Sequence, residues 1–287
     1  MGAATRSLQK LPISVATPVK ARRIEPHGIV LARNAFPISR KIAPGSKGRQ
    51  RQSMTLSPAQ LAATLDSTNL RLDATASDIE KLCVEAAAER FACVMIYPTS
   101  VPLAARTLKG TGMRIGTVIG FPSGRFATAA KAAEIAAAGT AGAHEVDIVM
   151  NYAALREGEL ASVSAEVLQL TTLAHKLGLL IKVIVETCFL PEACLLPALQ
   201  ICEDAGADFI KTSTGFGSAG AKPAHLALWA AHRRGSIQLK AAGGIKTLAD
   251  AQALLAAGAA RLGTSNAAAI VAEARGKTPV APTRGAY

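Results

Sequence analysis

The stretch Asp208-Phe209-Ile210-Lys211-Thr212-Ser213-Thr214-Gly215 places a lysine inside a short apolar run that ends in hydroxyl groups and a glycine. Burying an ammonium group is costly unless something compensates, so a lysine is rare inside a strand. A desolvated lysine beside another cation has a lowered pKa and can act as a nucleophilic amine. The stretch therefore predicts a strand that ends at a site. Lys211 is either a Schiff-base nucleophile or an edge-strand lysine whose ammonium group reaches solvent.

Short apolar runs alternate with helical windows on both sides of this stretch. The runs predicted as strands are 65–70, 91–97, 114–121, 144–150, 179–187, 209–214, 237–241 and 261–264. The helical windows are 57–65, 76–90, 101–109, 127–141, 157–177, 191–205, 223–234, 248–257 and 265–272. Strict alternation predicts a parallel sheet, and eight units in about 220 residues predict a single closed (βα)8 TIM barrel of the α/β class.

An open, doubly wound sheet is the alternative fold. Such a sheet usually carries a glycine-rich dinucleotide-binding turn after its first strand, whereas this chain has Asp66-Ser67-Thr68 in that place. The barrel is therefore favoured. A short lead-in helix is expected before the first strand, with Ser57 as its cap and Pro58 in its first turn.

The net charge of +12 belongs mainly to the N-terminal segment. Residues 1–53 contain eleven Lys and Arg and one acid, whereas the remaining 234 residues are nearly neutral at +2. Five prolines interrupt the segment, and we expect a disordered basic extension of a domain that spans residues 54–287. It is interpreted as a mis-called start before Met54, a transit segment or a nucleic-acid-binding arm. A nucleic-acid-binding arm would be expected to carry interleaved aromatic residues, which this segment lacks, so no nucleic-acid partner is predicted.

The cysteines and histidines show no metal-binding pattern. Five cysteines form no CxxC pair, and five histidines form no HxH or HExxH cluster, so no metal site is predicted. An odd number of cysteines favours reduced thiols in a cytosol-like compartment. No window approaches 18 uninterrupted apolar residues, so no membrane span is expected. The predicted location is cytoplasmic, or organellar if residues 1–53 are a transit segment.

Polar residues gather where the predicted strands end, which is where the active site of a barrel lies. The candidates are Asp66, Thr68, Cys93, Asp147, Lys182, Glu186, Lys211 and Lys240. Lys211 and Lys240 lie on consecutive strands, so their ammonium groups come close and one loses its proton more easily. Asp147 can take and return protons. We expect Cys93 in the core, and Lys182 and Glu186 could instead form internal ion pairs.

Two glycine-containing loops follow the last two predicted strands. Ala242-Gly243-Gly244-Ile245 follows the seventh, and Gly263-Thr264-Ser265-Asn266 follows the eighth and opens a helix. Barrels often bind phosphate in these loops through backbone N–H groups and a helix N-terminus. Gly215 and Gly217 are expected to join them. Turns need glycine in any case, but the position of these loops predicts a phosphate site.

Several segments together resemble the 2-deoxyribose-5-phosphate aldolase family of class I aldolases, from about Leu65 to Ile270. They are Phe209–Gly215, Lys240–Ile245, Glu145–Asp147, Ile181–Thr187, Gly120–Gly124 and Gly263–Ser265. The resemblance implies a (βα)8 carbon–carbon lyase that reversibly cleaves 2-deoxy-D-ribose 5-phosphate to D-glyceraldehyde 3-phosphate and acetaldehyde in deoxyribose breakdown. It implies a sugar phosphate as the partner, no cofactor, and a homodimer as a possible assembly.

The resemblance also implies roles for individual residues. Lys211 would form the Schiff base, Lys240 would lower the pKa of Lys211, and Asp147 would relay protons. The residues implied to bind the substrate are Asp66, Thr68, Lys182, Thr212, Gly215, Gly243, Gly244, Gly263, Thr264 and Ser265. Some members end in a mobile tail whose terminal tyrosine reaches the site, and this chain ends in Tyr287. Ala-Ala-Gly-Gly after Lys240 differs from members with proline or serine in the second place, and the basic N-terminus has no counterpart.

Two other functions stay open at this point. One is a Schiff-base aldolase for another sugar phosphate, because a ketone donor needs room at the imine carbon that a sequence does not measure. The other is a catalytically inactive barrel that binds phosphate and uses its basic tail as an interaction arm. Intact Lys211, Lys240 and Asp147 argue against the inactive barrel.

Overall fold

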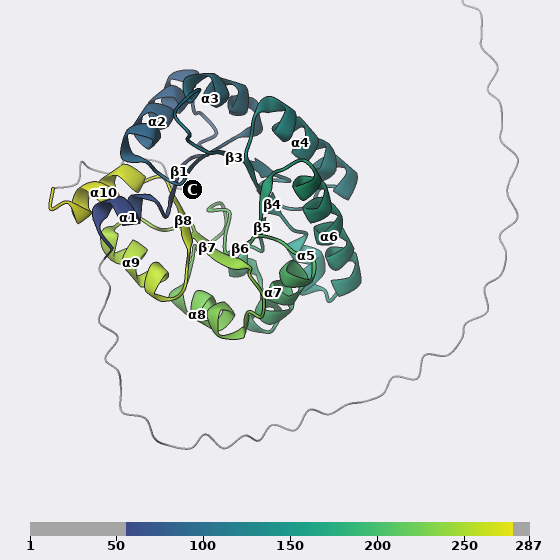
Figure 1. Ribbon diagram of the computed structural model, residues 1–287. Coiled ribbons are helices and arrows are strands. Elements are labelled where there is room, and N and C mark those ends of the chain that lie inside the picture. Colours follow the sequence, from purple (N-terminus) through teal and green to yellow (C-terminus); the bar gives the residue numbers. More distant parts are fainter. Residues whose placement is uncertain (1–55, 278–287) are drawn as a thin grey trace, which may run out of the picture. The chain divides into compact units, whose positions relative to one another are not determined.

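The computed structural model describes residues 56–277, which form one closed barrel (Figure 1). Eight parallel strands follow one another around the ring in chain order, and the first pairs with the last. The strands are β1 (Leu65–Asn69), β2 (Cys93–Ile96), β3 (Ile115–Ile119), β4 (Glu145–Val149), β5 (Leu180–Ile184), β6 (Phe209–Lys211), β7 (Gln238–Ala242) and β8 (Arg261–Thr264). The predicted (βα)8 barrel is confirmed.

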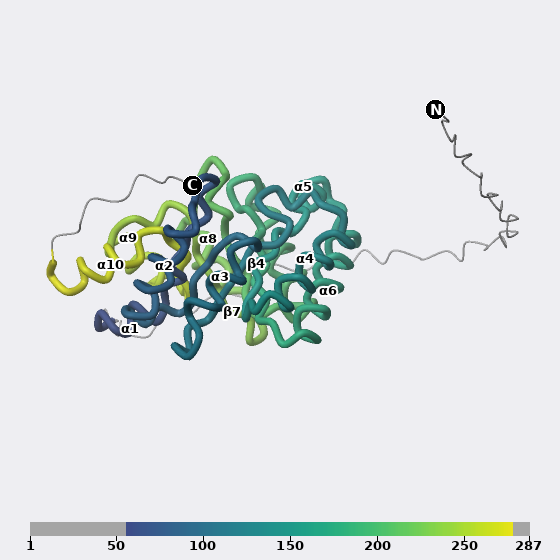
Figure 2. Tube along the Cα trace, turned by 90° about the horizontal axis from the view of Figure 1, so that it is seen from above, coloured from purple at the N-terminus to yellow at the C-terminus, as the bar shows by residue number. Residues whose placement is uncertain are grey.

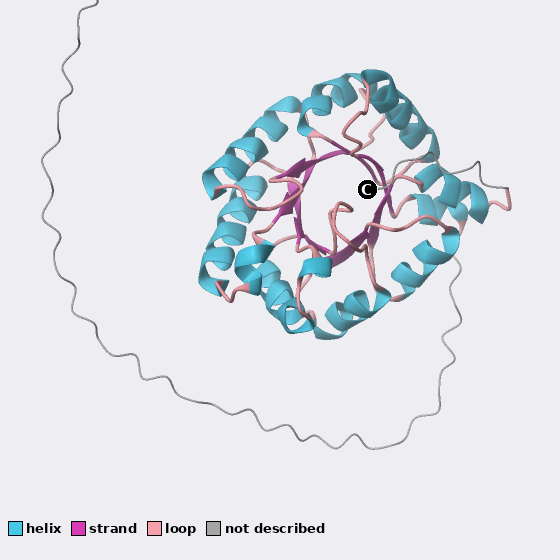
Figure 3. Ribbon diagram, turned by 180° about the vertical axis from the view of Figure 1, so that it is seen from behind, coloured by secondary structure: helices cyan, strands magenta, loops and turns pink. Residues whose placement is uncertain are grey.

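Helices surround the ring of strands (Figure 3). The α-helices are α1 (Pro58–Ala62), α2 (Ala76–Glu89), α3 (Val101–Thr107), α4 (Thr128–Ala141), α5 (Tyr152–Arg156), α6 (Leu160–Lys176), α7 (Leu195–Asp204), α8 (Pro223–His232), α9 (Leu248–Ala256) and α10 (Ala267–Ala274). The 3-10 helices are η1 (Pro98–Ser100), η2 (Thr187–Phe189) and η3 (Glu192–Cys194). Neighbouring helices such as α4 and α6 also contact each other (Figure 2).

The hydrophobic core lies between the ring and the helices. Ile148, Val183 and Leu239 from the strands pack in one buried cluster with Ile135 of α4 and Val167 of α6. The strands of such a barrel are covered by helices on the outside and filled with side chains inside, so they are buried on both faces. This burial explains why the sequence shows continuous apolar runs. It also explains why a charged residue within such a run indicates a special position inside the barrel.

Local signals in the sequence start the helices where expected. The Ser57 hydroxyl accepts the Gln60 N–H, and Pro58 occupies the first helical turn of α1. At the start of α2, the Thr75 hydroxyl accepts the Asp78 N–H while the Asp78 carboxylate accepts the Thr75 N–H. These reciprocal caps satisfy N–H groups that have no partner inside the helix.

Several predicted boundaries differ from the structure. The strand predicted over 179–187 ends at Ile184, because the chain turns at Glu186, whose backbone is left-handed with φ of 52°. The strand predicted over 209–214 ends at Lys211. The helix predicted over 157–177 is preceded by the separate helix α5 and begins only at Leu160. The helix predicted over 191–205 opens with the 3-10 turn η3 before α7.

Some predictions fall outside the described residues. They concern the basic segment 1–53 and the terminal Tyr287. Within residues 56–277, no helix is both long enough and apolar enough to cross a membrane.

Candidate active site

Four charged side chains from four strands meet inside the barrel. The register places Asp147 of β4 opposite Lys182 of β5, and Lys211 of β6 opposite Lys240 of β7. The Nζ atoms of Lys211 and Lys240 both donate to Oδ2 of Asp147 over 2.7 Å, and Lys182 Nζ donates to Oδ1 over 2.8 Å. Lys211 is 3% exposed and the others are fully buried. One carboxylate therefore joins three buried lysines.

The surroundings separate the pKa values of these groups. Burial lowers the pKa of Lys211 to about 8; Asp147 partly opposes this shift and Lys240 adds to it. At pH 7 about a tenth of such an amine is unprotonated, compared with roughly 0.04% at an ordinary lysine pKa near 10.4. Burial also disfavours the ionised form of Asp147, but Lys182, Lys211 and Lys240 together hold the pKa of that carboxyl well below its usual range. The site thus pairs an ionised carboxylate with a lysine that can be neutral.

More charged groups lie beneath this cluster, in the interior of the barrel. Asp66 accepts from Lys240 Nζ and from the Arg261 guanidinium. Glu145 lies 2.6 Å from Lys182 Nζ and also pairs with Arg261 and the half-exposed Arg114. Buried charges are tolerated when each has a partner.

The buried lysines differ in their carboxylate neighbours. The cluster holds the carboxylates Asp66, Glu145 and Asp147 together with Lys182, Lys211, Lys240 and Arg261, whose side chain is 13% exposed. Burial opposes the charge on Lys182, yet its three carboxylate neighbours raise its pKa, whereas the pKa of Lys211 is lowered. Lys211 is the amine available for chemistry.

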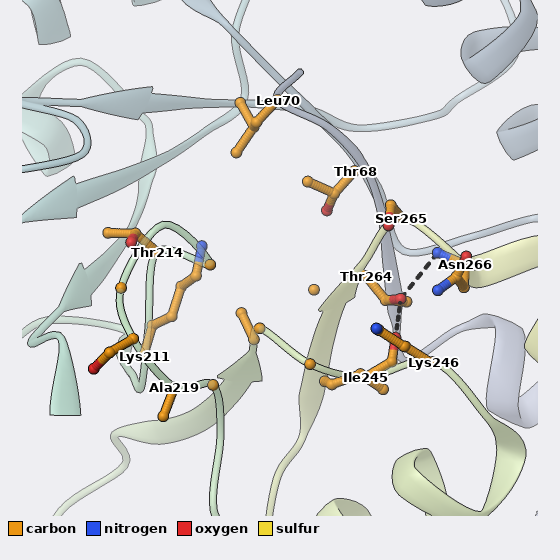
Figure 4. Close-up of a pocket in the computed structure, with 18 residues that line it drawn as sticks. Thr68, Leu70, Lys211, Thr214, Ala219, Ile245, Lys246, Thr264, Ser265 and Asn266 are labelled. Carbon is orange, nitrogen blue, oxygen red and sulfur yellow. Dashed lines mark hydrogen bonds between the residues drawn. The ribbon is translucent and has the colours of Figure 1, made fainter. Parts of the chain in front are cut away.

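A cavity of about 230 Å³ opens in front of Lys211 (Figure 4). It is bounded by the ends of β1 and β6 and by the loops that follow β6, β7 and β8. Its lining residues are Thr68, Leu70, Lys211, Thr214, Gly215, Gly217, Ser218, Ala219, Gly220, Ala242, Gly243, Gly244, Ile245, Lys246, Gly263, Thr264, Ser265 and Asn266. Figure 4 shows Lys211 on one side of this cavity and Thr264, Ser265 and Asn266 on the other. Lys211 thus lies across the cavity from the end of β8 and the start of α10.

Residues 60–270 match the DeoC/LacD family aldolase. The chain belongs to this family. It is 43% identical over 216 residues to the deoxyribose-phosphate aldolase of Bacteroides thetaiotaomicron, over 75% of this chain and 91% of that protein. It is 41% identical over 212 residues to that of Aciduliprofundum boonei, over 74% and 96%. The tetrameric deoxyribose phosphate aldolase of Aeropyrum pernix superposes with a TM-score of 0.72 at 31% identity, over 76% of this chain and 92% of that one.

In this DeoC/LacD family barrel, most residues predicted to bind substrate line the cavity. They are Thr68, Gly215, Gly243, Gly244, Gly263, Thr264 and Ser265. Gly215, Gly243 and Gly244 have positive φ values of 91°, 84° and 74°, which residues with a Cβ rarely adopt. A Cβ on Gly263 would lie 3.3 Å from Ala242 Cβ and 3.4 Å from Lys240 Cε, so this glycine packs closely against β7.

The structure does not bring Asp66, Lys182 and Thr212 to the cavity lining. Asp66 and Lys182 are fully buried in the ion-pair cluster. The Thr212 hydroxyl donates to the Ala242 carbonyl and accepts the Ala242 N–H, which ties β6 to β7. These residues hold the site together, and their direct contact with a substrate stays a prediction.

The hydroxyl of Thr264 also has protein partners. It donates to the Ile245 carbonyl over 2.7 Å and accepts the Asn266 N–H over 2.9 Å (Figure 4). Thr264 therefore joins the loop after β7 to the start of α10. Ser265, the hydroxyl residue that follows β8, is better placed than Thr264 to bind a ligand.

Three further residues of the site were missed in the sequence. Glu145 lies two positions before Asp147, and Arg261 lies two positions before Gly263, so alternation along a strand places both on the inner face. This alternation could have identified them. Lys246 follows the glycine loop and lines the cavity, but a lysine after a turn gives no such signal.

Cys93 and Glu186 were also candidates. Cys93 is fully buried, its thiol donates to the Val94 carbonyl, and burial raises its pKa. It therefore lies in the core as a protonated thiol, as expected. Glu186 accepts from Thr214 and Cys188, which are neutral donors rather than the ion-pair partner that we had considered. Within residues 56–277, no group of three or more His, Cys, Asp or Glu could hold a metal ion.

Proposed function

We propose that the protein is a class I aldolase that reversibly cleaves 2-deoxy-D-ribose 5-phosphate to D-glyceraldehyde 3-phosphate and acetaldehyde. The observation that carries the proposal is Lys211, a buried amine with a pKa of about 8 that opens onto a cavity and shares one oxygen of Asp147 with Lys240. A lysine of this kind is what nucleophilic attack on a carbonyl needs. Relatives named deoxyribose-phosphate aldolase, at 41% and 43% identity, support the choice of substrate.

The first steps form an electron sink on the protein. Unprotonated Lys211 attacks C1 of the open-chain aldehyde, and loss of water from the carbinolamine gives a protonated imine. The imine withdraws electrons from C2, so the bond between C2 and C3 can break. Because the iminium accepts these electrons, the reaction requires no metal or organic cofactor.

Proton transfers complete the cycle. Asp147, assisted by Lys240, removes the proton of the C3 hydroxyl as the bond between C2 and C3 breaks, so that C3 becomes the aldehyde of glyceraldehyde 3-phosphate. The electron pair remains on the enamine formed by C1, C2 and Lys211. The same acid–base pair returns a proton to C2, and water then releases acetaldehyde and the free amine. The bonds of Lys211 and Lys240 to one oxygen of Asp147 support this shared role.

The phosphate is proposed to bind on the far side of the cavity from Lys211. Gly215 in the loop after β6 and Gly243 and Gly244 in the loop after β7 line the cavity, and Asn266 is the N-cap residue of α10. Backbone N–H groups and a helix N-terminus favour an anion. Lys246 adds a cation at the same wall.

A coupled assay for glyceraldehyde 3-phosphate tests the proposal. Wild-type protein should form this product from 2-deoxyribose 5-phosphate, and Lys211→Ala should lose at least about 1,000-fold in kcat because the covalent step is gone. Turnover of a ketose phosphate in place of deoxyribose phosphate would favour the Schiff-base aldolase of other specificity. Tight binding of 2-deoxyribose 5-phosphate with no product would favour the inactive binding barrel.

The assembly and location of the protein follow the same reasoning. We propose a homo-oligomer, either a homodimer as predicted from the sequence or a tetramer like the relative from Aeropyrum pernix. We propose that it works in a reducing compartment such as the cytoplasm, since all five of its cysteines are free thiols.

A further inference from the structure

Glu186 is a buried carboxylate in an unusual setting. It is 1% exposed, and its backbone adopts the left-handed conformation with φ of 52° and ψ of 67°. Residues with a Cβ rarely adopt this conformation, and a glutamate has no special preference for it. Such a backbone is maintained only when the surrounding structure enforces it, and it often occurs at functional sites.

The carboxylate of Glu186 holds the loop that follows β6. Its Oε2 atom accepts the Thr214 N–H over 3.1 Å and also accepts the Thr214 hydroxyl. The same hydroxyl accepts the Phe216 N–H over 3.0 Å. The Oε1 atom accepts the Cys188 thiol over 3.5 Å. A Cβ on Gly217 would lie 3.2 Å from this carboxylate, so the loop packs directly on it.

This loop forms one arm of the cavity in which we place the phosphate. Thr214, Gly215 and Gly217 line the cavity together with Lys211. Further along, Ala221 donates its N–H to the Gly243 carbonyl, which joins the loop after β6 to the loop after β7. In Figure 1 this green segment curls over the centre of the ring. The orientation of the backbone N–H groups in this arm therefore depends on how Thr214 is held.

We propose that Glu186 is a positioning residue that keeps the loop after β6 in its phosphate-binding conformation and so sets the preference for phosphorylated over unphosphorylated sugar. The inference rests on the proposed function, because it assigns a specificity determinant to the same site. Glu186 does not line the cavity and is not a ligand of the phosphate. It acts through Thr214.

The test compares kcat/KM for 2-deoxyribose 5-phosphate with kcat/KM for 2-deoxyribose. Glu186→Gly removes the carboxylate while glycine tolerates the left-handed backbone. The ratio of the two values should fall about tenfold or more, through a higher KM for the phosphorylated sugar, while kcat for 2-deoxyribose changes by less than about twofold. Tenfold corresponds to about 1.4 kcal/mol, the loss of one well-made hydrogen-bond arrangement. Glu186→Gln keeps the reach and an acceptor oxygen, so it should restore most of the ratio.

Two further variants control the experiment. Glu186→Asn tolerates the left-handed backbone but is one methylene too short to reach Thr214, so it should match Glu186→Gly and serves if that variant does not fold. Arg90 is the other described residue with a Cβ and a positive φ, at 56°. Arg90→Gly relieves the same backbone strain at the end of α2, away from the loop, and should leave the ratio unchanged.

The outcomes separate this inference from the proposed function. An unchanged ratio in folded Glu186→Gly, or equal losses with both sugars, would overturn the positioning role. If the wild-type protein turns over neither sugar, the proposed function fails, and titration with inorganic phosphate then tests Glu186 by itself. Weaker phosphate binding in Glu186→Gly would support the inference, and equal binding would overturn it.

Discussion

Replacing Lys240 by methionine should move the pH dependence of the reaction without abolishing it. Lys211 Nζ and Lys240 Nζ each lie 2.7 Å from the same oxygen of Asp147, so the two nitrogens are at most twice that distance apart. Two unit charges about 5 Å apart interact by roughly 3 kcal/mol at an effective dielectric constant near 20, which is about two pKa units. Burial, the largest cause of the lowered pKa of Lys211, remains in the variant.

The sign and size of the effect follow from this estimate. The reactive form of Lys211 is the neutral amine, so kcat/KM rises as the pH passes the pKa, which is about 8 in the wild type. In Lys240→Met the rise should move about two units higher, towards pH 10. At pH 7 the shifted pKa alone should make the variant roughly 100-fold slower, and this part of the loss should shrink steadily as the pH is raised. The part that comes from the missing assistance to Asp147 should stay the same at every pH.

The assay is the initial rate of glyceraldehyde 3-phosphate formation at low substrate concentration between pH 6 and 10.5. Lys81→Met, on the exposed face of α2, is the matched control and should follow the wild-type profile. A loss in Lys240→Met that is equally large at every pH would refute the reasoning. That result would assign Lys240 to proton transfer alone and not to lowering the pKa of Lys211.

Three further changes test the interior, the cavity and the core. Lys182→Met should lower the free energy of unfolding by about 3–5 kcal/mol in urea titrations, because it removes a buried cation that Asp66, Glu145 and Asp147 share; unchanged stability would contradict the ion pairs. Gly220→Ala places a Cβ 2.1 Å from the Gly243 carbonyl oxygen and should raise KM for 2-deoxyribose 5-phosphate at least about tenfold, whereas Gly235→Ala, in open space, should leave KM unchanged. Leu226 is a fully buried residue of α8, so Leu226→Ala should cost about 2–5 kcal/mol of stability, and an unchanged stability would contradict its packing in the core.

The barrel could be predicted from the sequence because the alternation of apolar runs and helical windows is a direct result of burial. Strands covered on both faces read as apolar runs, and eight such runs alternate with helices. Lysines in three of these runs, Lys182, Lys211 and Lys240, and the acid Asp147 in a fourth are exceptions that burial does not explain. Their positions on neighbouring strands were enough to predict that they lie together.

The parts that sequence reasoning missed depend on contacts between distant strands. Nothing around Glu145 or Arg261 shows that they meet beneath Lys182, because this pairing exists only once the ring closes. The sequence could predict that the polar residues Asp66, Thr212 and Thr264 lie near the site. Only the structure shows that their side chains already form ion pairs or hydrogen bonds with other groups of the protein. The early end of β5 results from the left-handed backbone at Glu186, which no local propensity predicts.

Trapping of the covalent intermediate tests the central claim most directly. The protein is incubated with acetaldehyde or 2-deoxyribose 5-phosphate and sodium borohydride, and the modified peptide is identified by mass spectrometry. The account predicts a reduced adduct on Lys211 that is absent in Lys211→Ala. An adduct on Lys240 or Lys182 would contradict the assigned roles, and the absence of any adduct on folded protein that binds the sugar phosphate would contradict Schiff-base catalysis.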